Sequence, residues 1–473
     1  MLRSLFAWLP TITRVELGPM ALGEASAARP RDGDDALAPQ HAGATTRFVR
    51  ERAAPPTEAD LIVRSGRRRR LPGASGLLDV AMLDAAERQS LVCVRSWGRA
   101  GLRVGAFGAP SSPAFASRWC AAQATLPPVT EAPRRLVDGI LEQLETYRPG
   151  LIVPAHDGTI EALRRFRGEV EARTRIAMAS ESAMRIAVSK PLTLALAESL
   201  GILVPAGVTV AGERDVDDAL ETVGLPTVVK PAQSWVERDG LRRRLASTVA
   251  VDRPGVLAAV RRATEAGTEV ILQPWLPGAR EAVSLFYAEG RVWARFVQVA
   301  HRMNPPLGGS SVMRESAPPL ADIVDAAERL IRATGLEGYS ETEFRRDAAG
   351  RPVLMEINPR LSASVEIAVR SGVDFPMLIH RWAAGQRLAP VPGYRTGVRV
   401  RWLGGDVRWL RAVIQKQGLP DSPPTARAVG TFSRDFLRPA AYDYVDAHDV
   451  RPLVTATRTF LRRGIAKTRH RGG

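Results

Sequence analysis

Lysine is nearly absent from this chain. The 473 residues include 66 lysines and arginines, but only four are lysines: Lys190, Lys230, Lys416 and Lys467. Arginine therefore supplies almost all of the positive charge. A compact ammonium and a planar guanidinium are not interchangeable at a tight phosphate site, so the few lysines indicate where such a site could lie.

Cysteine is equally scarce, and long apolar runs are missing. Cys93 and Cys120 are the only cysteines, and they form no CxxC pair. This excludes a disulfide framework and fits a reducing compartment, so we expect a cytoplasmic protein. Since no run reaches about 18 apolar residues, we expect no transmembrane helix. The segment MLRSLFAWLP leaves a signal peptide as an alternative, although Pro10 interrupts its apolar run early.

The formal charge of +16 raises the question of an acidic partner. The arginines are scattered, however, with clusters near the two termini, and no RNA- or DNA-binding motif accompanies them. We therefore expect no nucleic-acid partner. A hydrophobic content of 45% and a charged content of 25% are those of an ordinary globular protein, and the length allows two to four domains.

The two ends of the chain differ in composition from its middle. Residues 1–72 are rich in Ala, Pro, Gly, Asp and Arg and end in the run Arg67–Arg70, which predicts a disordered basic tail. Residues 389–473 predict a C-terminal extension. Its last helix is basic with an apolar side, which fits either a docked helix or one lying on a membrane surface.

Residues 73–185 alternate between strand-like and helix-like segments. This alternation predicts a parallel, Rossmann-like sheet. No GxGxxG motif is present, so a dinucleotide site is not predicted. Asp157 follows the apolar strand 150–156, where it is either a helix N-cap or a substrate contact at the carboxyl edge of the sheet. The predicted segments are strands at 77–83, 102–107 and 150–156, and helices at 86–98 and 141–147.

One stretch, EGYSETEFRRDAAGRPVLMEINPRLS, organises the rest of the chain. Residues 339–344 and 351–357 read as two strands joined by the polar turn 347–350, which predicts a β-hairpin. Glu356 and Asn358 are two residues apart and so point to the same face. Pairing the strands could bring Glu343 of the other strand beside them.

Two carboxylates and an amide oxygen are the ligands that Mg²⁺ prefers, with water and substrate phosphates completing its shell. Arg360 follows as a bidentate donor for phosphate or carboxylate. The alternative is an ordinary exposed hairpin. Against that alternative, Glu356 interrupts an apolar run, where an unpartnered carboxylate would be costly to bury.

The string EINPR, with a Glu just before a Phe one strand earlier, resembles the metal-binding end of the ATP-grasp superfamily, as in carbamoyl-phosphate synthase and related carboxylate–amine ligases. The resemblance spans roughly residues 75–390. It implies an α/β fold, α+β within the grasp module, with a Rossmann-like pre-ATP-grasp domain at 73–185 and a two-lobed ATP-grasp domain at 186–388.

The resemblance also implies roles for individual residues. Lys190 and Lys230, two of the four lysines, fall where the family places ammonium groups on ATP phosphates. Arg302 stands beside the Gly-Gly-Ser-Ser loop and is expected to help Arg360 hold the reacting anion. The full implied set is Lys190, Lys230, Gln273, Pro274, Trp275, Leu276 and Glu281 for ATP, with Glu281 on the ribose; Glu343, Glu356 and Asn358 for Mg²⁺, with Mn²⁺ as an alternative; and Arg360 and Arg302 for catalysis.

The chain departs from the family pattern at two places. Ser189 stands where an Asp is common. The segment 232–247, which in the family is a glycine-rich cover for the phosphates, contains only Gly240 and carries Arg242–Arg244 instead. This cover decides whether bound ATP is used.

The implied activity is ligation of a small-molecule carboxylate to a small-molecule amine through an acyl phosphate, with release of ADP. The glycine-poor cover supports an alternative, an ATP-binding protein with weak or no catalysis. A nucleic-acid binder is a third hypothesis that rests on charge alone. The sequence leaves a homo-oligomer open.

Overall fold

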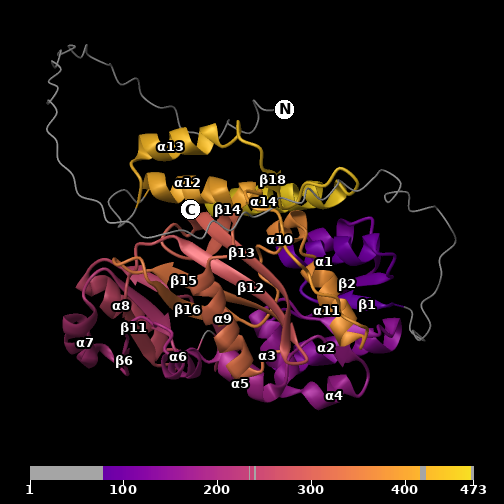
Figure 1. Ribbon diagram of the computed structural model, residues 1–473, viewed down its shortest axis with the longest axis horizontal. Coiled ribbons are helices and arrows are strands. Elements are labelled where there is room, and N and C mark those ends of the chain that lie inside the picture. Colours follow the sequence, from indigo (N-terminus) through magenta and orange to yellow (C-terminus); the bar gives the residue numbers. More distant parts are fainter. Residues whose placement is uncertain (1–77, 234, 239–240, 416–421, 470–473) are drawn as a thin grey trace, which may run out of the picture. The chain divides into compact units, whose positions relative to one another are not determined.

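The computed structural model describes residues 78–233, 235–238, 241–415 and 422–469. The prediction of a disordered tail over residues 1–72 lies outside these ranges. All the described residues belong to one compact unit (Figure 1). Among the described helices, none is both long enough and apolar enough to cross a bilayer.

The first part of the fold is a five-stranded parallel sheet, as the alternating pattern predicts. Its strands, in spatial order, are β3 (Cys120–Thr125), β2 (Val104–Gly108), β1 (Val80–Met82), β4 (Leu151–Val153) and β5 (Arg175–Ile176). The helices between them are α1 (Arg88–Arg99), α2 (Pro133–Tyr147), α3 (Asp157–Arg165) and α4 (Arg167–Glu171), with a 3-10 turn, η2 (Pro113–Ala116), before β3.

Both faces of this sheet are buried, because successive residues of β1 enter different cores. Val80 and Met82 pack with Trp97 of α1, whereas Ala81 packs with Ile140 of α2. A sheet covered on both faces needs nearly continuous apolar strands, and β1 and β4 are of this kind.

A small lobe follows α5 (Glu181–Val188) and α6 (Lys190–Ser199). Its sheet has the order β10-β7-β11-β6 and is antiparallel throughout. Helices α7 and α8 cover one face, and a separate hairpin, β8–β9, extends from the sheet. The elements are β6 (Val208–Val210), η3 (Glu213–Asp215), α7 (Val216–Val223), β7 (Thr227–Pro231), β8 (Trp235–Arg238), β9 (Leu241–Arg244), β10 (Thr248–Ala250), α8 (Arg253–Thr264) and β11 (Val270–Pro274).

The large lobe is a seven-stranded sheet of order β16-β15-β12-β13-β14-β17-β18. Helix α9 packs on one face of its first strands, and α10 and α11 follow the hairpin β15–β16. The elements are β12 (Arg280–Ala288), β13 (Arg291–Asn304), β14 (Ser310–Ala317), α9 (Ala321–Thr334), β15 (Gly338–Arg346), β16 (Pro352–Asn358), α10 (Glu366–Ser371) and α11 (Phe375–Ala383).

The segment after residue 388 is part of the same sheet. Strand β17 pairs with β14, and β18 pairs with β17. Helices α12 and α13 pack on each other beside β14 (Figure 1). Strands β17 and β18 of the C-terminal extension thus complete the large sheet. The domain boundary between residues 388 and 389 stays a prediction. Its elements are β17 (Arg399–Arg401), α12 (Leu403–Gln415), α13 (Thr425–Arg434), β18 (Ala441–Tyr442) and α14 (Arg451–Arg469).

Candidate functional site

The hairpin β15–β16 brings the predicted oxygen ligands together. Glu343 pairs directly with Glu356, because a bulge leaves Met355 unmatched between the pairs Glu343–Glu356 and Phe344–Leu354. The predicted strand pairing is confirmed. Without the bulge, the glutamates would fall on opposite faces of the sheet.

Asn358 links the two carboxylates. Its Nδ2 lies 3.3 Å from Oε1 of Glu343 and 3.3 Å from Oε1 of Glu356. A half-turn of the amide would present its oxygen to the same point. Within the described residues, no three carboxylate, imidazole or thiolate side chains converge on one metal site. Two carboxylates and one amide, a donor set that fits Mg²⁺, are what the hairpin offers.

Burial dominates the electrostatics of this cluster. It raises the pKa of Glu343 to about 7, although the guanidinium of Arg280 acts in the opposite direction and Glu356 adds to the rise. A carboxyl group that resists ionisation in this way gains most when a cation arrives to neutralise it.

The two lysines singled out by their rarity face this cluster. Lys230 alternates with Val229 along β7; Val229 packs under α7 and α8, so Lys230 points to the open face. Burial lowers the pKa of Lys230 to about 8, opposed by the charges of Glu356 and Glu343. Burial also lowers the pKa of Lys190, opposed by Glu356 and Asp157. The same carboxylate, Glu356, thus acts on both ammonium groups.

Lys190 begins α6 and crosses to the small lobe, where its Nζ donates to the carbonyl of Pro231 at 3.3 Å. The preceding Ser189, the departure from the family pattern, is the N-cap of this helix and accepts from the N–H of Leu192 at 3.4 Å. A serine therefore does the capping work an aspartate would do.

Arg360 is held by Asp157 of the first domain. One edge of the guanidinium binds the carboxylate through two hydrogen bonds: Nη2 donates to Oδ2 at 3.0 Å, and Nε donates to Oδ1. Burial pushes the pKa of Asp157 up, but Arg360 outweighs it and holds that pKa below its usual value. Of the two roles considered for Asp157, the cap is wrong: His156 is the N-cap of α3, through its Nδ1.

Arg280 is a site residue that the sequence analysis missed. Its Nη1 lies 3.2 Å from Oε2 of Glu343 and 2.9 Å from the carbonyl oxygen of Gly309 in the loop between β13 and β14. It stands on the same face as Glu343, because Ala282, two residues on, is the register partner of Glu343. Alternation along the strand separates Arg280 from Glu281, but only the register of β12 against β15 shows which of the two shares a face with Glu343.

Glu281 lies on the opposite face of β12. Its carboxylate accepts from Nε of Arg346 at 3.0 Å, and Arg346 also pairs with Asp322 in the first turn of α9. The predicted contact of Glu281 with a ribose therefore finds no support in this geometry.

Arg302 forms ion pairs with two carboxylates of the C-terminal extension. Its Nε and Nη2 each lie 2.7 Å from a carboxylate oxygen of Asp406, and Nη1 lies 2.5 Å from Asp435. Its guanidinium also lies over the ring of Trp409, 5.0 Å from the centroid. The structure thus does not join Arg302 to Arg360, and a catalytic role for it is unsupported.

Residues 273–276, which the resemblance assigns to ATP, lie at the connection between β11 and β12, and we call them the hinge. Gln273 is buried, and within the described residues its Oε1 has no hydrogen-bond partner. This leaves a free acceptor on the face of the small sheet that α7 and α8 do not cover. The N–H of Trp275 donates to the carbonyl of Pro226 at 3.1 Å, and the carbonyl of Leu276 accepts from Arg345 at 2.9 Å. Pro274 ends β11 between them.

The glycine-poor cover is a two-stranded hairpin, β8–β9. Trp235 at its start packs edge-on against His156, with ring centroids 5.6 Å apart. A Cβ placed on Gly158 would lie 3.2 Å from the indole, so the contact is tight. This hairpin therefore bridges the small lobe and the first domain, next to the Asp157–Arg360 pair.

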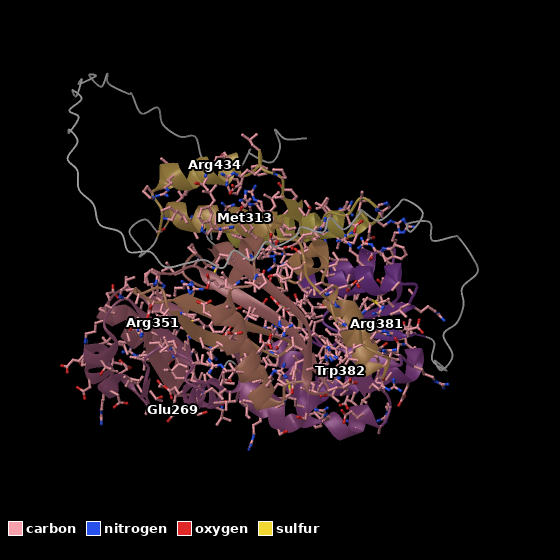
Figure 2. The ribbon with its side chains drawn as sticks, in the orientation of Figure 1. Glu269, Met313, Arg351, Arg381, Trp382 and Arg434 are labelled. Carbon is pink, nitrogen blue, oxygen red and sulfur yellow. The ribbon has the colours of Figure 1, made fainter. Side chains whose placement is uncertain are left out.

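A buried polar network lies beside the cluster and was also missed. Glu341, two residues before Glu343 on the same face, accepts from Nε2 of Gln298 at 2.8 Å, and that nitrogen also lies 2.7 Å from Oγ of Ser364. Ser284 connects the network to the hydroxyl of Tyr339 at 3.0 Å. Figure 2 shows how densely side chains fill the centre of the molecule, where these strands lie.

Comparison with protein families gives one match to this region. The family described as "ATP-grasp in the biosynthetic pathway with Ter operon" matches residues 267–405, from the end of the small lobe to the start of α12. The match contains the hairpin β15–β16 and strand β17.

Two relatives are D-alanine–D-alanine ligases. That of Gloeobacter violaceus is 29% identical over 223 residues, which cover 42% of this chain and 69% of the relative. That of Pseudomonas entomophila is 25% identical over 217 residues, covering 42% and 64%. The chain thus spans about two thirds of the lengths of these relatives.

Solved structures agree in fold. The biotin carboxylase of Campylobacter jejuni, in a β,γ-ATP complex, aligns with a TM-score of 0.56 at 16% identity, covering 68% of this chain and 74% of its own. The N5-carboxyaminoimidazole synthetase of Staphylococcus aureus, with ADP, aligns with a TM-score of 0.52 at 13% identity, covering 68% and 80%. At such identities the likeness is one of fold.

Proposed function

The chain belongs to the ATP-grasp superfamily, and on that premise we propose that it is an ATP- and Mg²⁺-dependent ligase that joins a carboxylate to an amine. The observation that carries the proposal is a convergence. The ammonium groups of Lys190 and Lys230 face the carboxylates of Glu343 and Glu356, and Asp157 holds Arg360 beside them.

These residues divide the work of phosphoryl transfer. Lys190 and Lys230 would screen the triphosphate, and Glu343, Glu356 and Asn358 would hold Mg²⁺, which would neutralise part of the phosphate charge. Transfer of the γ-phosphoryl group needs positioning and charge neutralisation rather than covalent help from the protein. An arrangement of fixed opposite charges supplies both.

The proposed reaction has two steps. A carboxylate oxygen of the first substrate attacks the γ-phosphorus, the bond to the β-phosphate oxygen breaks, and ADP leaves with an acyl phosphate formed. The amine then attacks the acyl carbon, phosphate departs with the bonding pair, and the amine nitrogen loses a proton. Arg360, fixed by Asp157, is placed to hold the acyl phosphate and the departing phosphate.

The adenine end is assigned to the hinge. Gln273 offers a buried acceptor of the kind that an exocyclic amine requires, and Pro274, Trp275 and Leu276 form the wall next to it. Glu281 and Arg302 are left out of the proposed machinery because their side chains are held in ion pairs elsewhere.

The test is a phosphate-release screen with the full chain, first over carboxylic acids and then over amines. Phosphate release is expected only with Mg²⁺ and a suitable acid. Glu356→Gln should lower turnover by a factor of about 100 to 1,000, because a preorganised charge facing the transferred group is lost. Glu289→Gln, which removes an exposed carboxylate at the turn between β12 and β13, is the matched control.

Full turnover in Glu356→Gln would show that the metal assignment is wrong. A second candidate, an ATP-binding protein with little catalysis, is favoured by the glycine-poor hairpin β8–β9. Tight MgATP binding with no phosphate release for any acid or amine would select it.

A further inference from the structure

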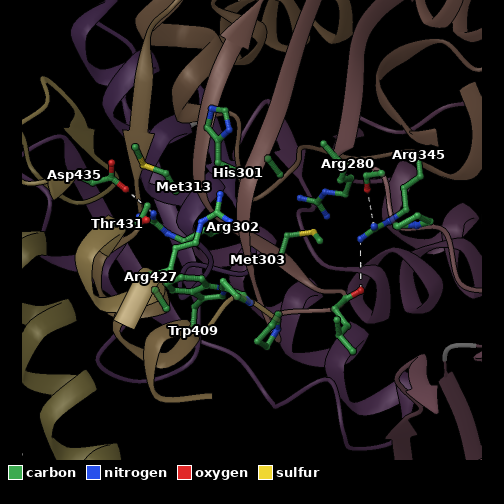
Figure 3. A pocket seen from close by; sticks show the side chains of 18 of the residues that line it. Arg280, His301, Arg302, Met303, Met313, Arg345, Trp409, Arg427, Thr431 and Asp435 are labelled. Carbon is green, nitrogen blue, oxygen red and sulfur yellow. Dashed lines mark hydrogen bonds and ion pairs between the residues drawn. The ribbon is translucent and has the colours of Figure 1, made fainter. Parts of the chain in front are cut away.

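A cavity of about 710 Å³ lies between the large sheet and the C-terminal helices (Figure 3). Its walls come from the hinge, from β13 and β14, and from α12 and α13. Seven arginines line it, and Asp435 is the single carboxylate among its lining residues. We call it the arginine pocket and define it by Trp275, Arg280, Arg345, Trp409, Arg427 and Arg434.

The arginine pocket adjoins the nucleotide site without coinciding with it. Arg280 is common to both, since it lines the pocket and donates to Glu343 at 3.2 Å. Lys190, Lys230 and Asn358 are not among the described residues that line it. A molecule in the pocket would therefore meet the metal cluster at its Arg280 end.

Helix α13 presents a basic stripe to this cavity. Arg427, Thr431 and Arg434 are spaced four and three residues apart, so they share one face, while Phe432 packs inward with Trp409. Figure 2 labels Arg434 on α13 and Met313 on β14, the two sides that the pocket separates.

The stripe carries charge that the fold does not neutralise. Arg302 is paired with Asp406 and Asp435, and Arg399 with Glu315. In contrast, the part of the chain that the structure describes places no carboxylate oxygen within 4.0 Å of Arg427 or Arg434. Exposed guanidinium groups gathered around a concave surface attract anions and raise their local concentration.

The deeper walls are apolar. Met303, Met313 and Trp409 are buried, and Trp275 lies at the hinge side with its indole N–H buried and, within the described residues, without a hydrogen-bond partner. A cavity of this size, with apolar deeper walls and guanidinium groups around them, suits a small molecule that carries anionic groups.

We propose that the arginine pocket binds the acid substrate of the ligase through anionic groups other than the reacting carboxylate. The substrate class is a small molecule with at least two further phosphate or carboxylate groups, oriented with its reacting carboxylate at Arg280. This inference rests on the proposed function for the identity of the occupant, while anion binding itself does not depend on it. Guanidinium forks bind phosphate and carboxylate alike, so the experiment must separate the two.

The experiment measures binding of inorganic pyrophosphate and of citrate to the full chain at fixed ionic strength, by calorimetry, with and without saturating MgADP. The double variant Arg427→Gln/Arg434→Gln is compared with Arg185→Gln/Arg381→Gln, which removes the same charge from exposed sites outside the pocket. The dissociation constant of the bound anion should rise about tenfold or more in the first variant only, with MgADP binding unchanged.

Tighter pyrophosphate than citrate would assign phosphate groups to the substrate, and the reverse would assign carboxylates. Equal losses in the two double variants, or no binding of either anion, would overturn the proposal. A parallel loss of MgADP binding in Arg427→Gln/Arg434→Gln would also overturn it, since the pocket would then be part of the nucleotide site. Anion binding with these properties but without any phosphate release would keep the pocket and reject the ligase.

Discussion

At the scale of single residues, Arg280 and Glu281 are neighbours in the chain that serve opposite faces of one sheet. Arg280 meets Glu343 at the proposed metal site, whereas Glu281 meets Arg346 beside α9. Successive side chains of a strand point to opposite faces of the sheet, so a shift of one residue moves a side chain from one face to the other. Sequence resemblance favoured the acidic residue, but only the register of β12 against β15 could decide between the two.

Lys230 gives a prediction about pH. Burial lowers its pKa to about 8, below the usual value of 10.5, so raising the pH through 8 removes the ammonium that we propose binds the phosphates. ADP affinity should therefore fall as the pH rises from 7 to 9, measured by calorimetry in the absence of metal. In Lys230→Arg the charge persists over this range, and the affinity should stay flat.

The same shift has a consequence for stability. The folded-state pKa of Lys230 is depressed, so the stability that this group contributes to the fold is present above its unfolded-state pKa and is lost as the pH falls through about 8.

An ADP affinity that is independent of pH in both the wild-type protein and Lys230→Arg would contradict the assignment of Lys230 to the phosphates.

At the scale of elements, the hairpins β15–β16 and β8–β9 contrast in how well they could be foreseen. The first has alternating apolar residues and a turn in which Asp347 accepts from the N–H groups of Ala349 and Arg351, all local features. The second is held by Trp235 on His156, two residues that are far apart in the chain. Local patterns predict the former kind of contact and not the latter.

The same distinction explains other successes and misses. The parallel sheet and the hairpin β15–β16 follow from periodicity and turn residues and could be predicted. Strand β3 (Cys120–Thr125) is built largely of small residues, and α13 (Thr425–Arg434) has a narrow apolar side. Neither element therefore has a sequence pattern that predicts it. The bulge at Met355 and the Asp157–Arg360 pair arise only when the chain is folded.

The hairpin β8–β9, the glycine-poor cover, can be tested for its attachment to the first domain. Trp235→Ala removes the contact with His156. The fraction of molecules in which this lid is detached should therefore increase about two- to tenfold, the range expected for an aromatic pair. Trypsin acting on the arginines of the hairpin should then cut it faster by the same factor. Trp235→Phe, which keeps a ring against His156, should be intermediate, and MgADP should slow cleavage in the wild-type protein. Equal cleavage rates in the two variants and the wild type would mean that Trp235 does not hold the lid.

At the scale of the whole molecule, buried ion pairs connect the C-terminal segment to the first domain and to the large sheet. Asp443 accepts from Arg88 of α1 at 2.7 Å and from Arg314 of β14. Asp449 accepts from Nε of Arg95 at 3.0 Å and from the hydroxyl of Ser117 at 2.7 Å. Parts of the chain more than 300 residues apart are thus joined through a few carboxylates.

Removing one such carboxylate leaves buried guanidinium groups without a counter-charge. Asp443→Asn should lower the free energy of unfolding by about 3–5 kcal/mol, measured by urea denaturation. Asp217→Asn is the control, since it breaks an exposed pair with Arg253 and should leave the urea midpoint unchanged. A similar midpoint for all three proteins would show that the pairs across the C-terminal segment do not stabilise the fold.

Arg280 occupies the boundary between two sites, and this has a thermodynamic consequence. Its guanidinium neutralises Glu343 on one side and lines the arginine pocket on the other. With a cation beside Glu343, the positive charge of Arg280 would become available to an anion in the pocket. Coupling of this kind is reciprocal: whatever factor the cation adds to the affinity of the anion, the anion adds to that of the cation. With such heterotropic cooperativity through one side chain, the cation and the acid substrate would bind together. Hydrolysis of ATP in the absence of the acid would then be limited.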